Sequence, residues 1–136
     1  MEHVYSQVNP GVLCHLVNRL EDITDRTNVS TDDQFLQLAT LRLPCGHTFR
    51  AHQHIWKPVP VGTVIAQESW VVIRGSVRVM FYDTDGTLLT TVDLGPGDAS
   101  MTFQGGHNYL ILEDDTVVYE YKTGPYQGQA LDKVFL

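Results

Sequence analysis

Residues 46–75 read GHTFRAHQHIWKPVPVGTVIAQESWVVIRG, and this stretch decides how the rest of the sequence is interpreted. His52 and His54 stand two positions apart, and Glu68 precedes Gly75 by seven positions. Alternate side chains of a β-strand lie on the same face, so His52 and His54 are expected to point to the same side and to bind one ion together. The stretch therefore predicts a metal site within a β-rich segment.

A third histidine, His107, follows a glycine-bearing segment and begins a stretch that contains Tyr109. Glu68 alternates with Trp70 and Val72, which places its carboxylate in an apolar interior, where it needs a partner. If the strands close into a barrel, three imidazoles and one carboxylate converge. This donor set suits one divalent transition metal, such as Zn, Fe, Mn, Ni or Co. The predicted metal ligands are His52, His54, Glu68 and His107.

Other interpretations of these residues are open. In a purely structural arrangement, the carboxylate of Glu68 pairs with Arg50 or Arg74. Gln67 is the substitute ligand if the strand register shifts by one residue. Cys45 imitates part of a thiolate site, but a zinc site of that kind needs a second pair of ligands elsewhere in the sequence. We expect Cys45 to be a turn residue.

Length and composition predict one ordinary globular domain. The chain has 136 residues, of which 43% are apolar and 18% are charged. Nine Lys and Arg residues are scattered among sixteen Asp and Glu, and the formal charge of −7 disfavours nucleic acid as a partner. The two cysteines form no disulfide framework, and no window resembles a signal peptide or a membrane span. We therefore expect a cytoplasmic protein that does not enter the membrane.

The hydrophobic pattern changes its period along the chain. Apolar residues at three- and four-residue spacings predict a short amphipathic helix over residues 12–23. From residue 34 onward the pattern has period two or is wholly apolar, which indicates strands. The expected strands cover residues 34–43, 47–54, 63–73, 76–83, 87–94, 99–103, 107–112 and 116–122. Turn signals separate them, and Asp85-Gly86 is the strongest hairpin signal.

This pattern predicts an all-β fold in a single domain over residues 1–136, with a helical extension over residues 1–33 and a closed β-barrel over residues 34–136. An apolar strand at residues 34–43 needs a partner on its edge. We expect a second copy of the chain to cover this edge, which makes the protein a homodimer.

The order of these residues resembles the two motifs of the cupin superfamily. The first cupin motif is a glycine, a spacer, two alternate histidines, a glutamate and a second glycine, and Gly46, His52, His54, Glu68 and Gly75 follow that order. The second motif is similar to residues 97–107, which end in His107. Thirteen residues separate His54 from Glu68, where cupins usually have three or four, and Phe103 replaces the motif proline. The resemblance implies a cupin jelly-roll barrel, also called a double-stranded β-helix.

Within the superfamily, the tail of the chain looks like the small WbuC-type cupins that are encoded among surface-polysaccharide genes. The similar segments are residues 120–126 and 132–135, and Lys57 fits the same pattern. We expect a small-molecule ligand, such as a sugar or nucleotide sugar. The extra residues 55–67 are expected to form a loop that shapes the ligand entrance at the mouth of the barrel.

A metal with two open coordination positions suits several functions. The first is an isomerase, epimerase or dehydratase that acts on a sugar or nucleotide sugar, because a Lewis acid polarises a carbonyl. Its acid or base has three candidates by position, which are Tyr109, Glu120 and Lys122. The alternatives are an Fe(II) dioxygenase, a non-catalytic saccharide-binding barrel, and a metal-free sugar ketoisomerase in which a histidine transfers the proton.

Overall fold

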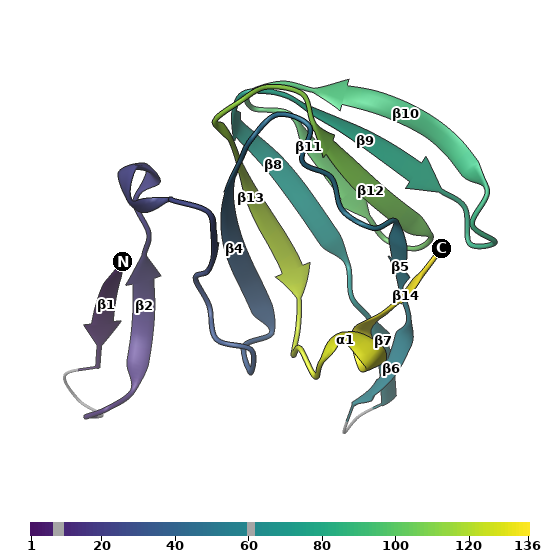
Figure 1. Ribbon diagram of the computed structural model, residues 1–136. Helices are drawn as coiled ribbons and strands as arrows, with labels where there is room; N and C mark the ends of the chain where they lie inside the picture. The colour runs from purple at the N-terminus through teal and green to yellow at the C-terminus, as the bar shows by residue number, and fades with distance from the viewer. Residues whose placement is uncertain (7–9, 60–61) are drawn as a thin grey trace.

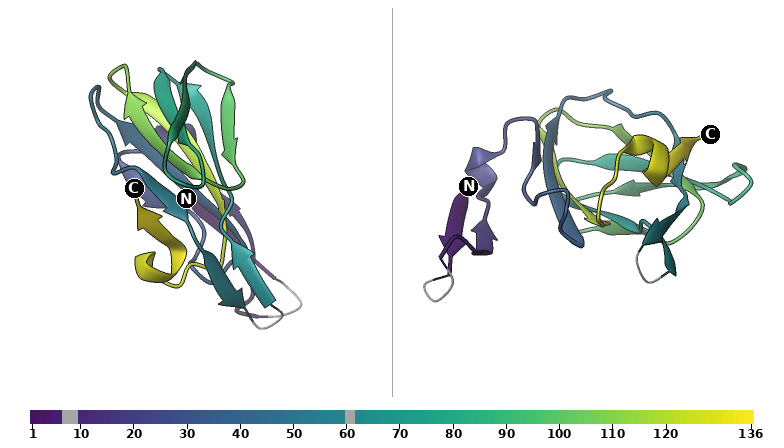
Figure 2. Two further views of the ribbon diagram at one scale, coloured as in Figure 1. Left: turned by 90° about the vertical axis from the view of Figure 1, so that its right-hand side faces the viewer. Right: turned by 90° about the horizontal axis from the view of Figure 1, so that it is seen from below.

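Two five-stranded sheets face each other and curve into a barrel in this computed structural model, which describes residues 1–6, 10–59 and 62–136 (Figures 1 and 2). One sheet has the order β10-β9-β12-β5-β14, with β5 (His52–His54), β9 (Val77–Tyr82), β10 (Leu88–Leu94), β12 (Gly106–Ile111) and β14 (Lys133–Phe135). The other has the order β11-β8-β13-β4-β3, with β3 (Arg26–Asn28), β4 (Leu36–Leu43), β8 (Glu68–Arg74), β11 (Ala99–Thr102) and β13 (Thr116–Thr123). The predicted all-β jelly-roll barrel is confirmed.

Within the described residues, four further strands lie outside these two sheets, in two hairpins. β1 (Glu2–Tyr5) pairs with β2 (Leu13–Val17) beside the barrel, and a 3₁₀ turn, η1 (Leu20–Asp22), follows (Figure 1). β6 (Trp56–Val59) pairs with β7 (Gly62–Ile65) at one end of the barrel. A short helix, α1 (Gln129–Asp132), leads into β14. No helix within the described ranges is long and apolar enough to cross a membrane.

The helix predicted over residues 12–23 is wrong. Residues 13–17 form β2, whose ladder hydrogen bonds go to β1, with Glu2 opposite Val17. Val12 is 50% exposed, Leu13 is 38% exposed and Leu20 is 45% exposed, so these three residues of the expected helical stripe do not pack into a core, although Ile23 at its end is buried. Most helical stability in proteins comes from packing an apolar face, and without that packing the pairing with β1 decides the structure.

Most of the predicted barrel strands agree with the structure within one or two residues, and the Asp85-Gly86 hairpin joins β9 to β10 as expected. Two of the predicted strands are longer than the observed ones. The strand predicted at 47–54 keeps only β5 and an isolated bridge between Thr48 and Leu110. The strand predicted at 63–73 is interrupted at residues 66–67 and becomes β7 and β8.

The segment before residue 34 and the predicted loop both contribute ordered strands. β3 covers the edge of β4, so β4 is not the open edge from which we expected dimerisation. The loop expected over residues 55–67 is the β6–β7 hairpin instead, and its tip at residues 60–61 lies outside the described residues. β14, which was not predicted, pairs with β5.

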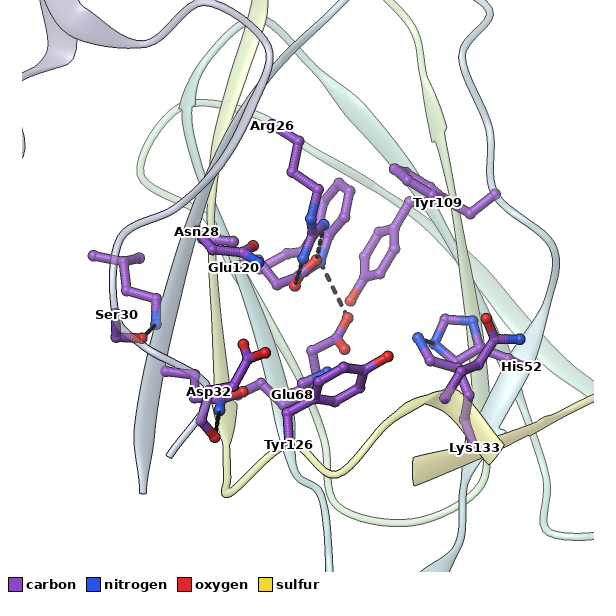
Figure 3. A pocket seen from close by; sticks show the side chains of 17 residues that line it. Arg26, Asn28, Ser30, Asp32, His52, Glu68, Tyr109, Glu120, Tyr126 and Lys133 are labelled. Carbon is purple, nitrogen blue, oxygen red and sulfur yellow. Dashed lines mark hydrogen bonds and ion pairs between the residues drawn. The ribbon is translucent and has the colours of Figure 1, made fainter. Parts of the chain in front are cut away.

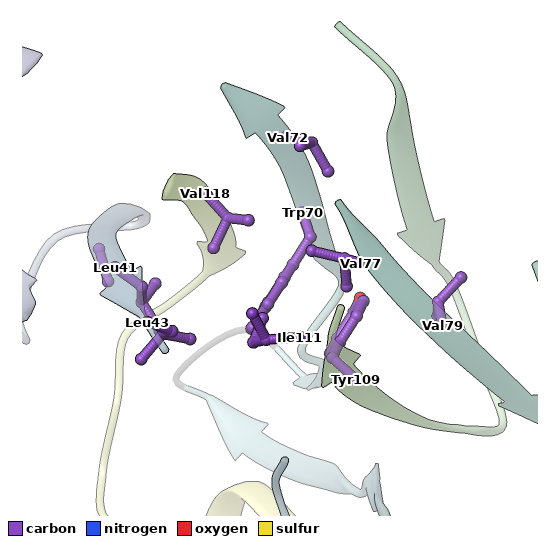
Figure 4. Packing of buried hydrophobic residues seen from close by; sticks show 10 residues of the cluster. Leu41, Leu43, Trp70, Val72, Val77, Val79, Tyr109, Ile111 and Val118 are labelled. Carbon is purple, nitrogen blue, oxygen red and sulfur yellow. The ribbon is translucent and has the colours of Figure 1, made fainter. Parts of the chain in front are cut away.

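The core lies between the two sheets, where the inward faces of β4, β8, β9, β12 and β13 meet (Figure 4). Trp70 on β8 and Tyr109 on β12 stack with their ring centroids 3.9 Å apart and their planes 4° from parallel. Leu41, Val72 and Ile111 are fully buried around them. Burial of these side chains is the main stabilisation of the barrel, and it fixes the two strands that carry Glu68 and His107.

The turn after β8 requires glycine. Gly75 has a φ of +77°, and a Cβ there would clash with Thr116 Oγ1 and lie 2.9 Å from Thr116 Cα. We predict that Gly75→Ala lowers the free energy of unfolding by about 2–5 kcal/mol, measured by urea denaturation. The matched control is Gly97→Ala, because Gly97 also has a positive φ, of +90°, but has open space around it. Its cost is about 1–2 kcal/mol, and equal losses in both variants would contradict the steric explanation.

Candidate metal centre

The four predicted metal ligands come together in the interior of the barrel. His52 and His54 lie on β5, His107 lies on the neighbouring β12, and Glu68 lies on β8 of the facing sheet. His52 is directly opposite His107 in the antiparallel ladder. One ligand atom from each of the four residues lies within 4.8 Å of the others, and all four side chains are buried. The arrangement has the compactness and the donor types of a metal centre.

The imidazoles are held from outside through their Nδ1 atoms. His52 Nδ1 lies 3.1 Å from the carbonyl oxygen of Arg50, and His107 Nδ1 lies 3.0 Å from Thr102 Oγ1. His54 Nδ1 lies 3.2 Å from the carbonyl oxygen of Asp132 and 3.1 Å from its carboxylate. Carbonyl and carboxylate oxygens accept hydrogen bonds, so they place the proton of His52 and His54 on Nδ1. The Nε2 lone pair of His52 is then available, and Nε2 of His54 faces the Glu68 carboxylate inside the group, so both rings direct Nε2 inward as they do around a bound metal.

Glu68 contacts two of these Nε2 atoms. Its Oε2 lies 3.2 Å from His54 Nε2 and its Oε1 lies 3.2 Å from His107 Nε2, while the Trp70 indole donates to Oε1. His107 Nε2 is nevertheless buried without a hydrogen bond. Its contact with Glu68 lacks the geometry of a hydrogen bond, and buried polar atoms usually make one, so this nitrogen marks a position where a ligand is expected.

The structural alternatives for Glu68 are not supported. Arg50 lies over the ring of Phe135, at 4.1 Å from its centroid, and the Nε of Arg74 donates to the carbonyl oxygen of Asp115. Gln67 is exposed and lies outside the group of four. Cys45 is in a turn, as expected, and is also outside the group.

Burial and charge shift the pKa values of the group. Burial opposes ionisation of Glu68, but the nearby His107 and His54 outweigh it and hold the pKa of Glu68 well below its ordinary value. The pKa of His52 falls to about 4, chiefly because the ring is buried and also because of the charges of Lys133 and His107. For His54, burial lowers the pKa, but the Asp132 and Glu68 carboxylates raise it above its ordinary value overall. The His52 ring is therefore neutral at neutral pH, with a lone pair that can bind a metal.

A buried carboxylate, Asp132, supports His54 from behind. Asp132 is 0% exposed, and its oxygens lie 2.7 Å from Lys57 Nζ and 3.3 Å from Lys122 Nζ. Lys57 is itself buried and also donates to the carbonyl oxygen of Pro125. Burial alone would raise the pKa of Asp132, but its contacts with His54, Lys57 and Lys122 lower it strongly. The β6–β7 hairpin and helix α1 are thus joined to a predicted metal ligand by one ionic network.

Sequence reasoning missed the role of Asp132, and the only signal was its place in the tail that resembles other small cupins. It also missed Arg26, whose guanidinium binds both carboxylate oxygens of Glu120 at 2.6 and 3.1 Å. Glu120, one of the acid or base candidates, is only 8% exposed. No short-range pattern connects residue 26 with residue 120.

A cavity of about 290 Å³ opens beside the four residues (Figure 3). Its wall includes His52 and Glu68, and it also includes all three candidates for acid or base, which are Tyr109, Glu120 and Lys122. Burial raises the pKa of Tyr109, with Glu68 acting in the same direction, so the phenol stays neutral. Its hydroxyl lies 3.0 Å from Ser100 Oγ. Tyr109 is therefore suited to hydrogen bonding and not to proton abstraction.

Lys133 is a further residue of the cavity that sequence reasoning did not select. Its Nζ lies 3.1 Å from His52 Nε2, on the side of the ring that faces the other ligands. Burial lowers the pKa of Lys133, while Glu68 acts in the opposite direction. The side-chain nitrogen of Lys133 therefore stands next to the group of four.

The barrel is similar to several solved structures. KdgF from Halomonas sp. has a TM-score of 0.56 and 21% identity, over 92% of this chain and 90% of KdgF. A cupin superfamily protein from Desulfitobacterium hafniense has a TM-score of 0.52 and 11% identity, over 72% of this chain and 74% of its own. The chain has the cupin fold.

The same cupin barrel is also found as part of a larger protein. The capsular polysaccharide assembling protein CapF from Staphylococcus aureus has a TM-score of 0.65 and 18% identity, and the match covers 90% of this chain. This cupin barrel spans only 34% of CapF. No protein-family model matches the sequence, and no curated protein is significantly similar to it.

The shifted pKa of His52 predicts how the metal-free protein responds to acid. Its pKa is about 4 in the folded state and about 6.5 in the unfolded chain, so the unfolded state binds more protons between these values. The free energy of unfolding of the chelator-treated protein should therefore fall as the pH is lowered from about 6.5 to about 4. The lowered pKa values of Glu68 and Asp132 mean that the stabilisation they give is lost chiefly below about pH 4. The raised pKa of His54 means that its stabilisation is lost above about pH 6.5.

Urea denaturation at several pH values tests this prediction. His52→Gln should show a flatter dependence between pH 6.5 and 4, whereas His3→Gln, at an exposed histidine, should keep the dependence of the natural chain. An identical slope in all three proteins would show that His52 does not cause the acid sensitivity.

Proposed function

We propose that this cupin binds one divalent transition metal through His52, His54, Glu68 and His107. The observation that carries the proposal is the orientation of the imidazoles. Each Nδ1 is held by a partner outside the group, and the donor atoms that remain lie within 4.8 Å of one another. The buried His107 Nε2 without a hydrogen bond supports it as well. Such a donor set suits Zn, Fe, Mn, Ni or Co.

We further propose that the protein is an enzyme that acts on a sugar or nucleotide sugar, as an isomerase, epimerase or dehydratase. When bound, the metal supplies a Lewis acid beside the cavity. A cavity of about 290 Å³ is at the small end of ligand pockets, so a sugar ring fills it better than a whole nucleotide sugar. Its carboxylate, amide and hydroxyl groups match the hydroxyls of a sugar. The similarity to a capsular polysaccharide assembling protein supports the same substrate class.

The cavity side chains suggest how a substrate is held. Tyr109, which stays neutral, is positioned to hydrogen bond a substrate oxygen. The carboxylate of Glu120 is oriented by Arg26, and the ammonium of Lys122 lies between Asp132 and the ring of Tyr126. We assign Glu120 and Lys122 as the candidates for proton transfer, because both face the cavity with fixed side chains.

A second candidate function is a non-catalytic saccharide-binding barrel. The ion pairs of Glu120 with Arg26 and of Lys122 with Asp132 favour it, because a paired carboxylate is a weak base and a paired ammonium is a weak acid. Binding of a sugar without turnover would select this function.

Metal content gives the first test. Protein purified without a tag should contain about one divalent metal ion per chain by mass spectrometry. His52→Ala and His107→Ala should each lose it, because removing one of four ligands leaves an incomplete site. His47→Ala is the matched control, since His47 lies outside the group of four, and it should keep the metal. Metal that persists in both ligand variants would contradict the assignment.

The support from Asp132 gives a second, graded test. Asp132→Asn removes the charge behind His54 but keeps the shape of the side chain, and we expect the metal affinity to fall about 10- to 100-fold. Competition with a chelating dye measures this affinity. Asp93→Asn is the control, because Asp93 is an exposed carboxylate that pairs with Arg78. Equal affinities in the two variants would show that Asp132 does not orient the ligand.

Activity is tested by NMR, with the metal-loaded protein and a panel of sugars and nucleotide sugars. Conversion that disappears in His52→Ala supports the metalloenzyme, and binding without conversion supports the saccharide-binding barrel. Oxygen uptake in the presence of Fe(II) would point to a dioxygenase instead, and intact conversion by metal-free protein would point to a histidine-based isomerase. A protein that neither binds nor converts any of these sugars would contradict the proposed substrate class.

A further inference from the structure

Lys133 shares a face of the sheet with the predicted metal ligands. β14 runs antiparallel to β5, with Lys133 opposite His54 and Phe135 opposite His52. This register directs the Lys133 side chain into the barrel, where its Nζ lies 3.1 Å from His52 Nε2 (Figure 3). The ammonium therefore approaches His52 at the nitrogen that is assigned to the metal.

Lys133 differs from the other cations around the cavity in its partners. Arg26 is paired with Glu120, and both Lys57 and Lys122 are paired with Asp132. For Lys133, the described part of the chain provides a contact with the neutral ring of His52 and no ion pair with a carboxylate. Lys57 and Lys122 share the one negative charge of Asp132, and among the described residues Lys133 is the cation of this group that contacts no carboxylate.

An ammonium beside a dication needs an anion. With a divalent ion bound, the single negative charge of Glu68 leaves one positive charge in the centre, and Lys133 adds another. Two uncompensated charges in a buried site are unfavourable unless a ligand supplies negative charge. The ammonium is also a compact point charge that binds carboxylate or phosphate oxygens well.

We propose that Lys133 is the anion-binding residue of the cavity and makes it select a sugar that carries a carboxylate or a phosphate over a neutral sugar. The proposal rests on the proposed metal centre, and it narrows the substrate class of that centre. The anionic group of the ligand takes the place of His52 Nε2 as the partner of the ammonium.

Removal of Lys133 then has two effects of opposite sign. Lys133→Met keeps the length of the side chain but removes its charge and its hydrogen-bond donor. Without the repelling ammonium, and with His52 Nε2 free, the metal affinity should rise about tenfold. The affinity of the metal-loaded protein for an anionic sugar should fall at least about tenfold, because the charged partner is lost. A residue with only a structural role would not strengthen metal binding when it is removed.

The experiment uses three sugars of similar size and different charge, namely glucose, glucuronate and glucose 6-phosphate. Metal affinity is measured by competition with a chelating dye, and sugar binding to the metal-loaded protein is measured by calorimetry. The natural chain should prefer one or both anionic sugars to glucose by at least about tenfold, and the stronger of the two identifies carboxylate or phosphate as the natural group. Lys133→Met should lose this preference, and Lys133→Arg should retain it.

Arg78→Gln is the matched control, because it removes one positive charge from the outer surface, where Arg78 pairs with the exposed Asp93. It should change neither affinity. The inference is overturned if the natural metal-loaded protein binds glucose as tightly as both anionic sugars, a result that does not depend on the folding of any variant. It is also overturned if Lys133→Met binds metal more weakly. In either case, metal in the natural protein would still support the proposed metal centre. A natural protein that binds no metal would contradict the metal centre itself.

Discussion

The rest of the centre depends on the burial of the Glu68 carboxylate. This group is 4% exposed, and a buried charge is tolerated only when opposite charges or hydrogen-bond donors surround it. Its partners do not come from its own sheet alone, because His54 and His107 belong to the facing sheet. The two sheets must therefore close before the charge is compensated. Closure of the barrel and assembly of the candidate metal centre are one event, with Trp70 contributing to both through its indole hydrogen bond and its stacking on Tyr109.

Surrounding contacts then determine what the centre can bind. Each imidazole is fixed at Nδ1 by a different element, which are the chain before β5, helix α1 and strand β11. The inward nitrogens are consequently held in place before any ligand arrives, and the entropy that binding must overcome is reduced. On the cavity side, the paired charges of Arg26 with Glu120 form a rigid polar wall. A rigid wall of this kind favours recognition of a ligand with a defined pattern of polar groups.

Short-range patterns in the sequence were sufficient for the barrel and for the four central residues. The alternation of Glu68, Trp70 and Val72 correctly placed the carboxylate inside, and the spacing of His52 and His54 correctly placed both rings on one face. What sequence reasoning missed depends on pairing between distant segments. β14 pairs with β5 across about eighty residues, and Asp132 lies on a helix of only four residues, which is too short to leave a periodic signal. The N-terminal helix was wrong for the same reason, because the partner strand β1 decides the structure of β2.

The β6–β7 hairpin has a consequence for any attempt to exchange loops among barrels of this kind. The thirteen residues between His54 and Glu68 look like a tolerant insertion, since loop length by itself has a small entropic cost. Yet the hairpin carries Lys57, whose ammonium is fully inside the protein and compensates Asp132. Trimming the connection to the usual cupin length would remove that ammonium and leave Asp132 with less positive charge around it. The connection is therefore a part of the electrostatic framework, and it can be transplanted only together with the aspartate that it neutralises.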